Sequence, residues 1–158
     1  MALSIGQPAP DFTLYSSEKQ PVSLTDFRGK NVVLLFFPFV YSSVCTKELC
    51  TVQETFGAYE QFGAQVLGIS VDPLFAAARF RQEYNIRFPL LSDFNKEVTR
   101  RYDVLLDEFA FGYRGVARRA TFVVDKSGIL RYAEVLGSPG DFPDLNRLAD
   151  ALAQLQDE

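Results

Sequence analysis

Two segments of the chain are continuously hydrophobic and rich in β-branched and aromatic residues. The first runs from Asn31 to Phe37, and the second runs from Gln65 to Val71. Runs of this length without polar alternation are typical of strands that are buried on both faces of a sheet. Pro38 ends the first run, because proline has no backbone N–H to donate to a neighbouring strand. These segments predict the centre of a buried sheet.

Helical spacing of apolar residues follows both strands, over residues 43–62 and again over residues 74–84. Later in the chain, strands at 120–124 and 129–135 flank the turn sequence Asp125-Lys126-Ser127-Gly128, which indicates a hairpin. The other expected elements are strands at 12–14 and 22–24, a short strand within 88–93, a short helix at 96–102 and an amphipathic helix at 142–156. This order predicts an α/β fold, a three-layer sandwich around a central mixed β-sheet, with residues 1–158 in a single domain.

The composition argues against several classes of function. Of the 158 residues, 47% are hydrophobic and 23% are charged, as in ordinary globular proteins. The net charge of −4 argues against binding to nucleic acid or to an anionic membrane. The longest apolar run, Val32–Tyr41, contains a proline and is too short for a membrane helix. Because Met1–Ile5 lacks the features of a signal peptide, we expect a cytoplasmic protein.

The sequence contains no histidine and only two cysteines, Cys45 and Cys50. The absence of histidine excludes Ser–His–Asp and Cys–His nucleophile pairs, histidine metal sites and acid–base catalysis by histidine. Two cysteines also make a poor structural zinc site, which normally uses four Cys or His ligands. We therefore expect no metal and no cofactor, and any chemistry at a cysteine must be assisted by other groups.

Cys45 is the candidate nucleophile, because it lies where a central strand is followed by a helix. Such junctions are the usual place for ligand chemistry in open α/β sheets. A free thiol has a pKa near 8.5, so only about 3% of it is ionised at pH 7. The N-terminus of a helix stabilises an anion by about 0.3–1 kcal/mol, whereas a change of one pKa unit needs about 1.4 kcal/mol. The helix alone is therefore insufficient, and an arginine is expected beside the thiol.

Four motifs, in the same order along the chain, resemble those of the peroxiredoxin family. Pro38-x-x-x-Ser42-x-x-Cys45 resembles the family's Pro-x-x-x-Thr/Ser-x-x-Cys, and Arg119-Ala-Thr-Phe-Val-Val-Asp125 resembles its Arg-x-x-Phe-φ-φ-Asp strand, where φ is apolar. Gly6-x-Pro8-Ala9-Pro10-Asp11-Phe12-x-Leu14 and Phe88-Pro89-Leu90-Leu91-Ser92-Asp93 match as well. The resemblance covers nearly the whole chain. It implies a thioredoxin-like fold and a thiol-dependent peroxidase.

The resemblance also implies roles for individual residues. Cys45 would be the peroxidatic nucleophile, and Ser42 would hydrogen-bond the peroxide and the thiolate. Pro38 would shape the loop and shield the site from water, while Arg119 would stabilise the thiolate and the polarised O–O bond. Glu48 lies one helical turn after Cys45, where it can hold the guanidinium of the arginine.

The role of Cys50 is open at this point. Its spacing from Cys45 resembles the bacterioferritin-comigratory-protein (PrxQ) branch, in which the second cysteine resolves the sulfenic acid as an intramolecular disulfide. Much of the remaining sequence is more similar to the one-cysteine alkyl hydroperoxide reductase E branch. Five residues of helix rise about 7.5 Å and bridged Cα atoms lie within about 7 Å, so this disulfide requires the helix to unwind. If no such disulfide forms, Cys50 is a structural thiol.

The implied substrates are hydrogen peroxide and organic hydroperoxides, and the implied reductant is thioredoxin or a similar thiol donor. A dithiol oxidoreductase is a competing interpretation, but that class usually carries Cys-x-x-Cys. A redox sensor that uses the thiol of Cys45 is a second competing interpretation. We expect a monomer or a weak homodimer. The aromatic segment Phe109–Tyr113 indicates loop packing, a dimer contact or the peroxide entrance.

Overall fold

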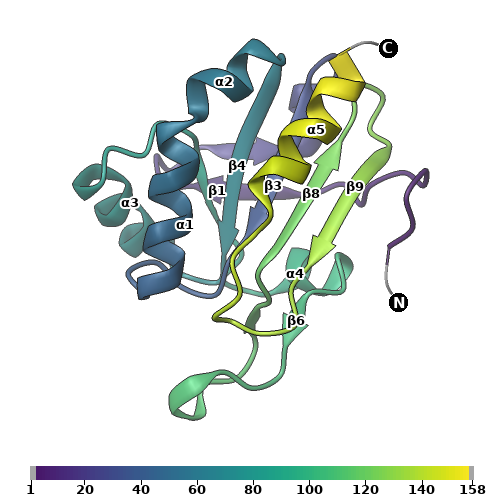
Figure 1. Ribbon diagram of the computed structural model, residues 1–158. Helices are drawn as coiled ribbons and strands as arrows, with labels where there is room; N and C mark the ends of the chain where they lie inside the picture. Colours follow the sequence, from purple (N-terminus) through teal and green to yellow (C-terminus); the bar gives the residue numbers. More distant parts are fainter. Residues whose placement is uncertain (1–2, 157–158) are drawn as a thin grey trace.

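The structure, a computed structural model, describes residues 3–156 and is built around a seven-stranded sheet (Figure 1). The strands lie in the order β2-β1-β5-β4-β3-β8-β9. β4 pairs in parallel with β3 and β5, whereas the other pairings in this sheet are antiparallel. The strands are β1 (Thr13–Ser16), β2 (Pro21–Ser23), β3 (Asn31–Phe36), β4 (Ala64–Ser70), β5 (Leu90–Ser92), β8 (Ala120–Val124) and β9 (Leu130–Val135). The predicted mixed sheet is confirmed.

Helices and loops cover both faces of this sheet, which gives the predicted three layers (Figure 1). Alternate residues of β3 point to opposite sides, so that Val33 and Leu35 contact one helical layer while Leu34 and Phe36 contact the other. The first layer contains α1 (Ser43–Glu54), α2 (Phe56–Gln61), α3 (Leu74–Glu83) and α5 (Leu145–Gln156). The second contains the short helix η1 (Leu24–Phe27), α4 (Glu97–Arg101) and the ribbon of β6 (Leu105–Leu106) and β7 (Val116–Ala117).

The single helix predicted over residues 43–62 is wrong, because the structure divides it at Thr55 into α1 and α2. The hydroxyl of Thr55 donates to the carbonyls of Thr51 and Val52, at 3.3 and 3.1 Å. Its own N–H donates to the Val52 carbonyl at 3.1 Å, which tightens the turn. Side-chain bonds of this kind compete with the regular helical pattern, and no apolar spacing reveals them.

The last helix begins at Leu145 and not at residue 142. Asp144 caps it, since its Oδ1 accepts the N–H of Arg147 at 3.0 Å. Pro143 also disfavours helical backbone at Phe142. Four further elements were not predicted. The strands β6 and β7 have two residues each, the 3₁₀ turn η2 (Ala110–Gly112) has three and η1 has four, so they are too short to produce a pattern.

Within residues 3–156, no helix is both long enough and apolar enough to cross a membrane. The expected single domain over residues 1–158 includes four terminal residues, Met1, Ala2, Asp157 and Glu158, that lie outside the described part of the chain.

Candidate active site

Cys45 lies in the first turn of α1, after the loop of residues 37–42 that connects β3 to this helix. Ser42 is the N-cap residue, with extended backbone angles, and its carbonyl accepts the N–H of Thr46 at 2.9 Å. The first N–H groups of a helix have no partner within the helix and carry its partial positive charge. The Cys45 side chain is fully buried beside this end, and both cysteines are free thiols.

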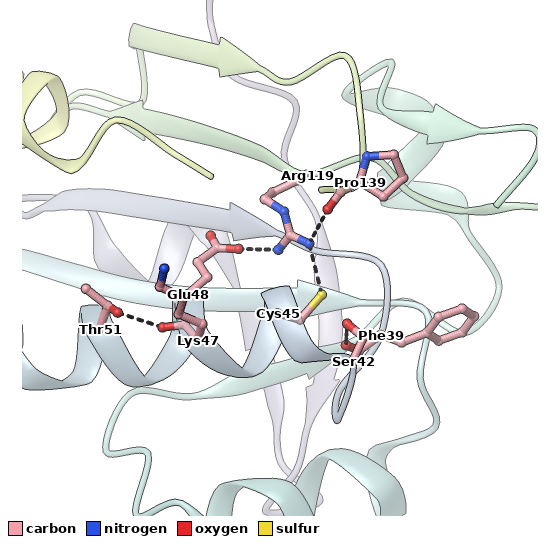
Figure 2. Close-up of polar contacts among 8 residues, drawn as sticks. All are labelled: Phe39, Ser42, Cys45, Lys47, Glu48, Thr51, Arg119 and Pro139. Carbon is pink, nitrogen blue, oxygen red and sulfur yellow. Dashed lines mark hydrogen bonds and ion pairs between the residues drawn. The ribbon is translucent and has the colours of Figure 1, made fainter. Parts of the chain in front are cut away.

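Arg119 contacts Cys45 from the opposite side of the site, immediately before β8 (Figure 2). One amino group, Nη2, donates to Cys45 Sγ at 3.3 Å and to the carbonyl of Pro139 at 2.9 Å. The other, Nη1, donates to Glu48 Oε1 at 2.5 Å. One planar guanidinium therefore connects the first two turns of α1 to the loop between β9 and α5.

Glu48 and Arg119 form a buried ion pair, with side-chain exposures of 0% and 1%. The pair has a single point of contact, because Glu48 Oε2 and Arg119 Nε have no hydrogen-bonding partner among the described residues. Burial raises the pKa of Glu48 from 4.5 to about 7, against the opposing charge of Arg119; the charge of Glu134 adds a smaller upward contribution. The Glu48 carboxyl therefore binds protons near neutral pH, whereas the guanidinium stays charged.

The neighbouring arginine points elsewhere. Arg118 is half-buried, and its Nη1 donates to the carbonyl of Gly137 at 3.4 Å. Successive side chains of extended backbone point to opposite sides, which explains how two adjacent arginines have different environments. The motif assigned Arg119 to the site, and the structure places Arg119 against Cys45.

The structure places the other site residues around the same loop. Pro38 is buried in the loop of residues 37–42, and Ser42 is half-buried at its end. The Ser42 hydroxyl donates to the carbonyl of Phe39 at 3.1 Å (Figure 2), so it can donate to another acceptor only after it rotates. Cys50 lies further along α1 and is half-buried. Burial, and secondarily the charge of Glu54, raise the pKa of its thiol.

A cavity of about 770 Å³ is lined in part by residues 39–42 of the loop, and several of its lining residues are aromatic. The ring of Phe39 lies edge-on to those of Phe109 and Tyr113, with 5.5 Å between centroids in each case. The aromatic segment Phe109–Tyr113 therefore packs against the residues that precede α1. A larger cavity, of about 920 Å³, is lined by polar groups such as Gln53, Glu54 and Arg81, and by none of the six predicted site residues.

Sequence reasoning missed the carbonyl of Pro139, which holds Arg119 in place. Backbone carbonyls occur at every residue, so no sequence signal identifies the one that accepts this bond. Within residues 3–156, no group of three or more Cys, Asp or Glu side chains is arranged to hold a metal ion.

Comparison with known proteins identifies the family. The model of the AhpC/TSA family matches residues 5–133. The chain belongs to the AhpC/TSA family. Among named relatives, this peroxiredoxin is 39% identical to alkyl hydroperoxide reductase E of Mycobacterium tuberculosis over 156 residues, which cover 97% of this chain and 98% of the relative. It is 40% identical to the putative peroxiredoxin bcp of Coxiella burnetii over 132 residues, which cover 82% of this chain and 87% of the relative.

Solved structures agree with this assignment. The crystal structure of peroxidoxin BcpB from M. tuberculosis superposes with a TM-score of 0.82 at 27% identity, over 98% of this chain and 97% of that chain. The thioredoxin-like peroxiredoxin fold implied by the sequence is thus confirmed. The protein is an oxidoreductase of the peroxidase class, and its activity depends on a thiol.

Proposed function

We propose that the protein reduces hydrogen peroxide and organic hydroperoxides, with Cys45 as the nucleophile. One observation carries this assignment: the buried guanidinium of Arg119 donates to Cys45 Sγ at 3.3 Å, at the N-terminus of α1. A cation and a helix terminus both favour the thiolate over the thiol. In a chain without histidine, they supply the activation that a base would otherwise provide.

In the first step, the thiolate of Cys45 attacks one peroxide oxygen and the O–O bond breaks. The attacked oxygen stays on sulfur with its hydrogen as a sulfenic acid, and the other oxygen takes a proton from solvent and leaves as water or an alcohol. Negative charge spreads over sulfur and both oxygens in the transition state, so fixed donors have their largest effect there. Arg119 is one donor and the Ser42 hydroxyl is the second. Glu48 orients the guanidinium, and Pro38 keeps water away from the thiol.

The aromatic cavity supports the use of organic hydroperoxides as well as hydrogen peroxide. Phe39, Phe109 and Tyr113 present apolar surface on the same side of the loop as Ser42, which also lines the cavity. An apolar substituent of the peroxide gains free energy when it leaves water for such a surface. The named relative alkyl hydroperoxide reductase E is consistent with this substrate class.

In the second step, Cys50 condenses with the sulfenic acid, which releases water and leaves a disulfide. A thioredoxin-like dithiol then reduces the disulfide and is itself oxidised. Because the two cysteines are five residues apart on α1, the first turns of the helix must unwind before the sulfur atoms meet. The oxidised protein should therefore have less helix and a new protease-sensitive segment over residues 46–52.

One observation favours a one-cysteine peroxidase as the second candidate. Burial and Glu54 raise the pKa of Cys50, which lowers the fraction of thiolate available for the condensation. In that case Cys50 is a structural thiol, and the external reductant attacks the sulfenic acid of Cys45 directly.

Mass spectrometry after one equivalent of peroxide separates the two mechanisms. For the two-cysteine mechanism, we expect a loss of two hydrogens in the wild type, a stable sulfenic acid in Cys50→Ser and no oxidation in Cys45→Ser. A stable sulfenic acid in the wild type identifies a one-cysteine enzyme. A Cys45→Ser variant that still consumes peroxide at the wild-type rate would sink the assignment of the nucleophile.

Two properties of the whole protein stay predictions. We propose that residues 1–158 form a single domain that acts in the cytoplasm as a monomer or a weak homodimer. Light scattering over a concentration series measures the association, and a tight higher oligomer would contradict it.

A further inference from the structure

The loop of residues 37–42 contains a backbone conformation that needs external support. Tyr41 has a φ of 71°, in the left-handed region that is unfavourable for residues with a Cβ atom. Its ring packs edge-on against Phe80 of α3, with 5.1 Å between centroids. A residue keeps such a conformation only where its surroundings hold it. The loop precedes α1 directly (Figure 2), so its conformation sets the direction in which Cys45 enters the site.

The support comes from Asp72, which follows the central strand β4. One carboxylate oxygen, Oδ2, accepts the backbone N–H of Val40 at 2.8 Å and the hydroxyl of Ser70 at 2.8 Å. The backbone carbonyl of Asp72 accepts the hydroxyl of Ser92, on β5, at 2.7 Å. Asp72 is buried, with 8% of its surface exposed. The carboxylate is thus fixed to β4 through Ser70 and holds Val40, the residue that precedes Tyr41.

We propose that Asp72 is a positioning residue of the peroxidase reaction, which acts by holding the active-site loop through the N–H of Val40. The bond to a carboxylate is about twice as strong as a bond to a neutral acceptor. It offsets the unfavourable conformation at Tyr41 and keeps the first turn of α1 where Cys45 Sγ meets Arg119. The hydrogen bonds of the carboxylate run to Val40 and Ser70 and not to Cys45, so its effect on the thiol passes through the loop.

This role has opposite consequences for the two steps of the reaction. Oxidation of Cys45 needs the loop in place, because a displacement of about 1 Å costs about a hundredfold in rate. Formation of the disulfide, which rests on the proposed function of Cys50, needs the adjoining helix to unwind. Weakening the bond to Val40 therefore slows the first step and accelerates the second.

Three variants separate positioning from general stability. Asp72→Ala removes both carboxylate bonds, and Asp72→Asn leaves a neutral acceptor of nearly the same shape. Burial raises the pKa of Asp72, although the hydrogen bonds from Val40 and Ser70 lower it. A raised pKa means that the site disfavours the charged carboxylate, so we expect the neutral side chain of Asp72→Asn to fit without unfolding the protein. Ser92→Ala is the control, because it removes the hydrogen bond to the Asp72 carbonyl and leaves the carboxylate intact.

Three measurements apply to each variant: the rate of Cys45 oxidation by peroxide, the rate of the following disulfide step, and hydrogen exchange of the peptide containing residues 37–42. We expect oxidation to fall about tenfold or more in Asp72→Ala and less in Asp72→Asn. Exchange at Val40 should accelerate by about ten- to a hundredfold in Asp72→Ala, which corresponds to the loss of one charged hydrogen bond. Ser92→Ala should oxidise at the wild-type rate.

The proposal is overturned if Asp72→Ala oxidises as fast as the wild type, or if Ser92→Ala loses as much oxidation rate at the same thermal stability. It is also overturned if a disulfide forms in the wild type and forms more slowly in both Asp72 variants. If the wild type forms no disulfide, the proposed role of Cys50 fails by itself. The oxidation rate and the hydrogen exchange then still decide the role of Asp72.

Discussion

The most informative single substitution is Arg119→Lys, because it keeps the positive charge but removes the planar guanidinium that donates to three acceptors. The guanidinium reaches Cys45 Sγ at 3.3 Å, Glu48 Oε1 at 2.5 Å and the Pro139 carbonyl at 2.9 Å at the same time. The three donors of a lysine ammonium radiate from one nitrogen atom and cannot span these acceptors. The ammonium will pair with Glu48, whose buried carboxylate otherwise loses its counter-ion. Cys45 then loses its donor.

The expected loss in rate follows from this contact. A hydrogen bond to a charged group contributes about 1.5–3 kcal/mol, which corresponds to roughly a ten- to hundredfold change in rate. Donors that contact developing charge in a transition state usually contribute more, about 10²–10³ in rate. We therefore expect the second-order rate of Cys45 oxidation to fall by about a hundredfold in Arg119→Lys.

The assay is oxidation by hydrogen peroxide in a quench-flow instrument, with alkylation of the remaining thiol and detection by mass spectrometry. Cys50→Ser serves as the background, so that only Cys45 is followed. Arg118→Lys is the matched control: the side chain of the adjacent arginine donates a long bond of 3.4 Å to the Gly137 carbonyl, and its loss should leave the rate within about twofold of the parent. Thermal unfolding of each variant shows whether the fold is intact.

The reasoning is refuted if folded Arg119→Lys reacts as fast as the parent. That result would mean that the charge alone activates Cys45 and that the directed bond from Nη2 adds nothing. Equal losses in Arg118→Lys and Arg119→Lys would instead point to a diffuse electrostatic effect, and would remove the distinction between the two arginines.

Two further predictions concern stability. Because burial raises the pKa of Glu48 from 4.5 to about 7, the folded protein binds a proton that the unfolded chain has released between these pH values. The contribution of this group to the free energy of unfolding therefore falls by roughly 3 kcal/mol as the pH rises from 4.5 to 7, and the fall should disappear in Glu48→Gln when both are followed by urea titration. An unchanged pH profile in the variant would contradict this. A Cβ at Gly68 in β4 would lie 2.7 Å from Leu90 Cδ2, so Gly68→Ala should lower the free energy of unfolding by about 1–3 kcal/mol. The control Gly57→Ala, on α2 with no atom within 4 Å, should raise it by up to about 1 kcal/mol, and equal effects of the two would refute the packing argument.

Elements with strong local patterns could be predicted from the sequence. β3 and β4 are continuous apolar runs, and the structure places them side by side at the centre of the sheet. The break at Thr55 could not be predicted, because it depends on whether one hydroxyl bonds to carbonyls of the preceding turn. The ribbon of β6 and β7 has only two residues in each strand, which is shorter than any periodicity that a sequence can display.

The site divides in the same way, between residues that a motif marks and groups that none does. Cys45 is singled out by its place at the start of a helix, and Arg119 by the resemblance of its segment to the Arg-x-x-Phe motif, so both could be named before their contact was seen. The groups that hold them are ordinary: a carbonyl at Pro139 and an N–H at Val40, which meets a carboxylate 32 residues further along the chain. The contact at Val40 comes from the parallel pairing of β3 with β4, which brings the ends of both strands to one edge of the sheet. The contact at Pro139 comes from the antiparallel pairing of β8 with β9, which brings the end of β9 beside Arg119. The candidate residues of this peroxiredoxin could therefore be named from the sequence and its resemblance to the family, whereas the contacts that position them follow from strand order and need the structure.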